Sequence, residues 1–117
     1  MLFVCYPRCT TCQKAQKWLD GQGIAYEIRH IKEDNPTRAD LEHWWRQSGL
    51  PLRRFFNTSG LQYKAMGLKD RLSSMSEEEQ LELLATDGML VKRPILAAED
   101  FVLVGFRQAE WEQALNQ

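Results

Sequence analysis

The first thirty residues place an apolar run, a helix-patterned segment and an alternating run in close succession. Residues 2–6 (LFVCY) are typical of a buried strand, and Pro7 ends that strand. Apolar residues then recur at helical spacing from residue 10 until a pair of glycines, and residues 24–28 alternate as a half-buried strand does. A strand, a helix and a strand at this spacing predict a βαβ unit with parallel strands and a right-handed crossover.

The segment 37–88 has a different pattern and contains no convincing strand. Thr37 with Asp40, and Ser76 with Glu79, have the spacing of capping boxes, in which each side chain bonds the backbone N–H of the other residue. We therefore predict a helical insertion over residues 37–88.

The strand pattern returns near the C-terminus. Residues 95–98 and 101–104 predict an antiparallel hairpin, and residues 108–116 predict a final helix. The 117 residues suit a single α/β domain, in which a four-stranded mixed β-sheet flanked by helices is formed by residues 1–36 and 89–117. The helical insertion then separates a βαβ half from a ββα half.

Composition excludes several classes of function. A net charge of -1 argues against direct binding of nucleic acid, which requires a basic surface. No apolar stretch approaches the length of a membrane span, and the first residues lack a signal-peptide pattern. We therefore expect a cytoplasmic protein without a membrane partner, and nothing in the sequence demands more than a monomer.

The pair Cys9 and Cys12 stands where the first strand gives way to the first helix. Unpaired N–H groups and the dipole at a helix N-terminus favour a thiolate at Cys9. Cys12 lies one turn further on, where it can close a redox disulfide with Cys9 or pack as a small apolar residue, whereas Cys5 suits the core. Zinc is disfavoured because only Cys5, His30 and His43 could complete four ligands, at unhelpful spacing. An odd number of cysteines also favours redox or catalytic use over a structural disulfide framework.

Four sequence blocks together resemble the arsenate reductase (ArsC) and Spx family, and most closely its arsenate reductase-like subgroup of the YusI and YffB type. They are YPRCTTC at 6–12, FFNTSG at 55–60, KRPI at 92–95 and VGFR at 104–107. The resemblance covers nearly the full length and implies a thioredoxin-like fold.

The resemblance also implies residue roles. Cys9 matches the family's nucleophile, Arg93 and Arg107 match the arginines that hold an oxyanion, and Pro94 matches a proline expected to be cis. Arg8, beside Cys9, is expected to lower its pKa. The residues expected at the substrate are Arg8, Asn57, Arg93, Pro94 and Arg107.

Two positions depart from the arsenate reductase pattern. Asn57 stands where those enzymes place an arginine, and Cys5 stands where they place a histidine. A tetrahedral dianion would therefore meet fewer charged donors here, while the thiol chemistry is unaffected.

Two functions follow as hypotheses. The first is a thiol-dependent oxidoreductase without a bound cofactor, in which Cys9 attacks a disulfide or an oxyanion such as arsenate. Cys12 or glutathione would resolve the adduct, with glutathione or a thioredoxin or glutaredoxin system as reductant. The second is an Spx-like redox-sensing regulator that binds the α-subunit of RNA polymerase. The sequence ends shortly after Arg107 without the C-terminal tail of Spx regulators, which favours the reductase.

Overall fold

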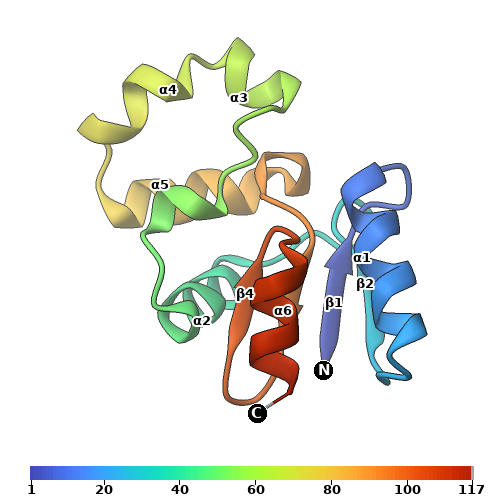
Figure 1. Cartoon of the computed structure of the whole chain (residues 1–117). Helices are drawn as coiled ribbons and strands as arrows, with labels where there is room; N and C mark the ends of the chain where they lie inside the picture. The colour runs from blue at the N-terminus through green and yellow to red at the C-terminus, as the bar shows by residue number, and fades with distance from the viewer. Residues whose placement is uncertain (117) are drawn as a thin grey trace.

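A computed structural model describes residues 1–116 and contains a four-stranded sheet in the order β2-β1-β3-β4 (Figure 1). The strands are β1 Leu2–Cys5, β2 Glu27–His30, β3 Ile95–Ala97 and β4 Val102–Val104. β1 pairs with β2 in parallel, β1 with β3 antiparallel and β3 with β4 antiparallel. The predicted α/β fold with a mixed sheet is confirmed.

The helices follow the predicted order along the chain. They are α1 Thr10–Gly21, α2 Arg38–Ser48, α3 Leu61–Ala65, α4 Leu68–Arg71, α5 Glu77–Thr86 and α6 Gln108–Leu115, with 3₁₀ turns η1 Leu52–Phe55, η2 Leu72–Ser74 and η3 Gly88–Leu90. Both predicted capping boxes are present, at the start of α2 and of α5. Each satisfies N-terminal N–H groups that would otherwise lack a partner.

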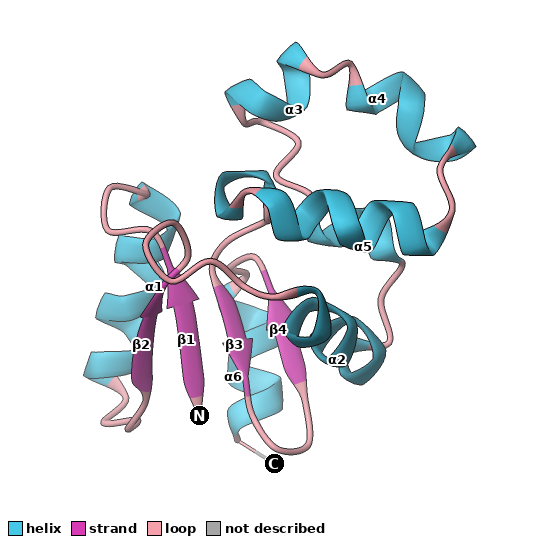
Figure 2. Cartoon of the chain, turned by 180° about the vertical axis from the view of Figure 1, so that it is seen from behind, coloured by secondary structure: helices cyan, strands magenta, loops and turns pink. Residues whose placement is uncertain are grey.

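Helices cover both faces of the sheet. Figures 1 and 2 show α1 and α6 on one face and α2 on the other. Because side chains alternate along a strand, Phe3 and Cys5 of β1 pack in a cluster with Trp111 of α6, while Val4 belongs to the opposite cluster. The indole of Trp111 donates a buried hydrogen bond to the Gly105 oxygen at 3.0 Å.

The second strand lies further along the chain than its sequence pattern predicts. β2 occupies Glu27–His30 instead of residues 24–28. Gly23 adopts a left-handed conformation, with φ 69°, and the N–H of Ile24 bonds back to the Leu19 oxygen at 3.2 Å. The start of the alternating run therefore completes the helix end, and pairing begins where the N–H of Glu27 reaches the Met1 oxygen at 2.9 Å.

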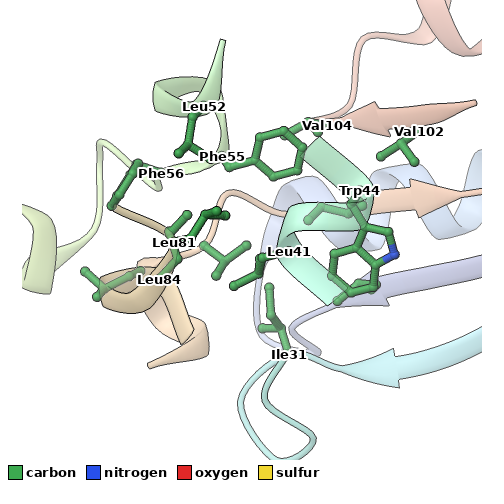
Figure 3. Packing of buried hydrophobic residues seen from close by; sticks show 14 of the residues in the cluster. Ile31, Leu41, Trp44, Leu52, Phe55, Phe56, Leu81, Leu84, Val102 and Val104 are labelled. Carbon is green, nitrogen blue, oxygen red and sulfur yellow. The ribbon is translucent and has the colours of Figure 1, made fainter. Parts of the chain in front are cut away.

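The insertion is helical as predicted, but its first helix, α2, packs directly on one face of the sheet. Leu41 and Trp44 of α2 pack with Val102 and Val104 of β4, and residues from η1 and α5 extend this cluster (Figure 3). The remainder forms a lobe in which α3 and α4 arch over α5 (Figures 1 and 2). Within residues 1–116, no helix has both the length and the apolar character needed to cross a membrane.

Candidate active site

Cys9 is the N-cap of α1, at the tip of the loop that follows β1. Its backbone is extended, with φ −82° and ψ 120°, and its N–H donates to the Tyr6 oxygen at 3.0 Å. Its own oxygen accepts the first helical hydrogen bond, from the N–H of Gln13, at 3.0 Å. The half-buried thiol therefore lies at the positive end of α1, where a thiolate is favoured.

The surroundings of Cys9 give its thiol a lowered pKa. Partial burial acts to raise the pKa, but the backbone N–H and the thiol of Cys12, the N–H of Thr11 and the side chain of Arg93 together outweigh it. The Cys9 side chain forms no close capping hydrogen bond, so the N–H groups act on the sulfur over a longer distance. The net effect stabilises a thiolate at a position that solvent can reach.

Cys12 has the opposite environment one turn further along α1. Its side chain is only 2% exposed, and burial together with the negative charge of Cys9 raises its pKa to about 12. The N–H of Tyr6 lies 3.5 Å from its sulfur. Cys5 is also buried, and burial and then the charge of Cys9 raise its pKa as well. The site therefore pairs an accessible thiolate with a buried, protonated thiol.

The register of β1 against β3 explains why Arg93 lies beside Cys9. Val4 pairs with Ile95, and because the two strands are antiparallel, the residues before Ile95 lie opposite the residues after Val4. The Arg93–Pro94 peptide bond is cis, which confirms that prediction, and Pro94 is buried. The oxygen of Pro94 accepts a hydrogen bond from the N–H of Gly105 at 2.8 Å, which ties this loop to the end of β4.

Tyr6 contacts each of the three groups that form the site, a role that the sequence pattern did not reveal. The Arg93 guanidinium lies over its ring, 5.3 Å from the centroid, at a distance typical of a cation–π interaction. Its backbone oxygen accepts from Cys9 and its N–H approaches Cys12. An aromatic residue at the end of β1, facing the segment before β3, was the available signal for this role.

Arg93 uses only some of its N–H donors in hydrogen bonds within the described residues. Nη1 donates to the Met89 oxygen at 3.4 Å, and Nε is buried without a hydrogen-bond partner within residues 1–116. The side chain as a whole is half-buried. A guanidinium presents five donors, so this one keeps donors available for an anionic group bound beside Cys9.

The other residues predicted for substrate binding are less closely joined to Cys9. Arg8 is exposed on the same loop. Arg107 is exposed and pairs with Glu110 at 3.7 Å. Asn57 is 7% exposed, and its N–H donates to the Leu90 oxygen at 2.7 Å. No hydrogen bond or ion pair described within residues 1–116 connects Asn57 or Arg107 to Cys9.

The part of the chain that the structure describes contains no cluster of potential metal ligands. Across residues 1–116, no three His, Cys, Asp or Glu side chains gather in a way that could hold a metal ion.

Comparison with known proteins places this chain among proteins of the same fold. The model of the ArsC family matches residues 5–114. The protein YusI of Bacillus subtilis (strain 168) is 47% identical over 113 residues, which cover 97% of this chain and 96% of YusI. The crystal structure of an ArsC family related protein from Bacteroides fragilis is 55% identical, with a TM-score of 0.94 and coverage of 96% of this chain and 94% of that chain.

Relatives with a named activity are less similar. The regulatory protein MgsR of Bacillus subtilis (strain 168) is 29% identical over 110 residues, which cover 94% of this chain and 86% of MgsR. The structure of an arsenate reductase from Vibrio cholerae is 26% identical, with a TM-score of 0.79 and coverage of 99% of this chain and 97% of that chain. The named relatives thus include both an enzyme and a regulator.

Proposed function

This chain belongs to the ArsC family and has its thioredoxin-like fold, and we propose that it is a thiol-dependent oxidoreductase whose nucleophile is Cys9. One observation carries the proposal: an accessible thiol with a lowered pKa stands one helical turn from a buried thiol whose pKa is raised to about 12. This asymmetry suits a dithiol in which one sulfur attacks the substrate and the other stays protonated until the adduct has formed.

With a disulfide substrate, the Cys9 thiolate attacks one sulfur, the substrate S–S bond breaks, and the departing thiolate takes a proton from water. Cys12 then gives its proton to solvent and attacks the Cys9 sulfur. A Cys9–Cys12 disulfide forms and the second substrate thiol leaves. The protein loses two electrons and the one proton of Cys12. The two substrate thiols take up those two electrons and two protons, one of which balances the proton from Cys12 and one of which comes from water. A glutathione, thioredoxin or glutaredoxin system restores the dithiol.

The two pKa shifts support this order of events. While Cys9 is a thiolate, its negative charge is one of the causes that keep Cys12 protonated. Once Cys9 is in a neutral mixed disulfide, that contribution disappears and burial is the main cause left. The proton on Cys12 is therefore easier to remove after the adduct forms than before it.

An oxyanion such as arsenate is the second substrate type within this proposal. Cys9 would displace a hydroxyl group as water and form a sulfur–arsenic bond. Attack on the Cys9 sulfur by Cys12 or glutathione would then leave the bonding pair on arsenic. Arg93 is the residue best placed to hold the anion because its guanidinium already acts on the Cys9 sulfur.

Turnover with cysteine variants tests the proposal. The disulfide of 2-mercaptoethanol serves as substrate and glutathione as reductant. We expect Cys9→Ser to abolish turnover and Cys5→Ser to leave it near the wild-type rate, because a serine hydroxyl is a poor nucleophile at neutral pH. Cys12→Ser distinguishes the two routes of resolution: lost turnover indicates Cys12, and retained turnover indicates glutathione. Unchanged turnover in Cys9→Ser would contradict the proposal.

The similarity to the regulatory protein MgsR supports a second candidate, a redox-sensing regulator. The resemblance to Spx would give such a regulator the α-subunit of RNA polymerase as its partner. In that case the same dithiol would act as a switch whose oxidation alters a docking surface. Binding to the C-terminal domain of the polymerase α-subunit, measured with reduced and with diamide-oxidised protein, separates the candidates. Binding that depends on the redox state favours the regulator, and no binding in either state favours the reductase alone.

A further inference from the structure

A cavity lies between the helical lobe and the end of α2, and Cys9 is not among its lining residues. Its volume is about 790 Å³, within the range of small-molecule sites, and its walls come from η1, α3, α4, η2, α5 and the end of α2. Trp45, Phe56 and Tyr63 form an aromatic part of the wall. The Trp45 indole donates to the Leu50 oxygen at 2.9 Å, and the rings of Phe56 and Tyr63 lie 6.4 Å apart. These rings are thus held in place by the fold.

The charged groups around this cavity are mostly cations. Arg53, Arg54, Lys69 and Lys92 line it, against the single acid Glu77. None of these five takes part in the ion pairs described within residues 1–116. The whole chain carries a net charge of -1, so this local excess of positive charge is not a general property of the surface. A concave wall with charges of one sign concentrates ions of the other sign.

We propose that this cavity binds an organic anion with an aromatic, ring-sized body. The unpaired cations would attract a carboxylate, sulfonate or phosphate group, and the aromatic wall would take up the ring. Lys92 places the cavity next to Arg93 and Trp45 belongs to α2, but the other lining residues belong to the lobe. The proposal is therefore independent of the proposed thiol chemistry and can be tested without turnover.

Three probes with one ring system separate the role of charge from that of the ring. They are 2-naphthoate, the neutral 2-naphthalenemethanol and the cationic 2-naphthylmethylammonium, titrated into reduced wild-type protein and followed by amide chemical shifts. We expect the anion to bind about tenfold more tightly than the alcohol, and the cation most weakly. The shifted amides should belong to η1, α3, α4 and α5, and the affinity for naphthoate should fall as salt is added.

Charge variants show whether binding takes place in this cavity. Lys69→Gln should weaken naphthoate binding about two- to fivefold, since one partly exposed charge pair is lost. Lys64→Gln is the matched control because Lys64 is exposed on α3 outside the cavity lining, and its affinity should be unchanged. Glu77→Gln should tighten binding by a similar factor. A gain of affinity cannot come from damage to the fold.

The outcomes decide the proposal in either direction. Preference for the anion, together with opposite effects of Lys69→Gln and Glu77→Gln, supports it. Equal affinity for the three probes, shifts confined to α1 and α6, or no binding of naphthoate at millimolar concentration would overturn it.

Discussion

Replacing Arg93 by glutamine removes a full positive charge from a side chain that lowers the pKa of Cys9 in this structure. The guanidinium lies over the Tyr6 ring and donates to the Met89 oxygen, and glutamine keeps a polar side chain but not the charge. A neighbouring cation favours the thiolate, so Arg93→Gln is expected to raise the pKa of Cys9. The chemical consequence is a change in the pH dependence of attack.

The size of that change follows from two opposing effects. At a pH below the Cys9 pKa of both wild type and variant, each unit of increase in that pKa lowers the thiolate fraction about tenfold. The same unit makes the thiolate intrinsically about threefold more nucleophilic, because the Brønsted coefficient for thiol–disulfide exchange is about 0.4–0.5. For each unit by which the pKa of Cys9 rises, the variant should therefore react about threefold more slowly than wild type at low pH and about threefold faster at high pH. The two pH profiles should cross.

The assay uses a neutral disulfide, so that substrate charge does not enter, in a Cys12→Ser background where the adduct on Cys9 accumulates. Rates of adduct formation are measured across the pH range by mass spectrometry. Arg71→Gln on α4 is the matched control: it removes an exposed arginine far along the chain from the site and should leave the profile unchanged. An inflection that does not move in Arg93→Gln, or profiles that do not cross, would refute this reasoning.

Three further predictions concern stability. Folding raises the pKa of Cys12 from 9.0 to about 12, so the protonated thiol contributes stability that is complete below pH 9 and is lost as the pH rises toward 12. Urea unfolding of the reduced protein should show this loss of stability, and the loss should be smaller in Cys12→Ala. Ser76→Ala removes the side-chain acceptor of a capping box and should lower the free energy of unfolding by about 1 kcal/mol, whereas an unchanged urea midpoint would argue against the cap. Gly88→Ala should lower the free energy of unfolding by about 3 kcal/mol, because a methyl group there would collide with the backbone oxygen of Ile31. In the control Gly21→Ala, the added methyl group meets nothing within 4 Å and should change the free energy of unfolding by less than about 0.5 kcal/mol. Equal effects of the two substitutions would contradict the packing described.

Features determined by local sequence were predicted well. The capping boxes depend on two side chains three residues apart, and the βαβ unit depends on periodicity within thirty residues. The position of β2 was predicted too early because alternation was read from Ile24, whereas Gly23 turns that residue back onto α1. Hydrogen bonds at a helix end are invisible to a pattern of apolar residues.

The site itself was only partly predictable because it depends on register. The position of Cys9 follows from one loop and one helix start, and its role could be proposed from sequence. The contact between Arg93 and Tyr6 joins residues far apart in the chain, and it requires the pairing of Val4 with Ile95. Arg107 was predicted at the site, but the structure leaves it exposed and paired with Glu110. This outcome depends on the direction of its side chain at the start of α6, which the sequence pattern does not reveal.

The central claim is that Cys9 is the attacking thiol, and the same measurement shows whether Cys12 or glutathione resolves the adduct. Reduced wild-type protein and the Cys12→Ser variant are each mixed with less than one equivalent of a small disulfide, quenched in acid, and mapped by peptide mass spectrometry. Wild-type protein should carry a Cys9–Cys12 disulfide and no adduct, whereas Cys12→Ser should carry the substrate thiol on Cys9. Wild-type protein that retains a stable adduct on Cys9 without an internal disulfide would indicate resolution by glutathione. An adduct on Cys5, or an unmodified Cys9 in Cys12→Ser, would contradict the claim.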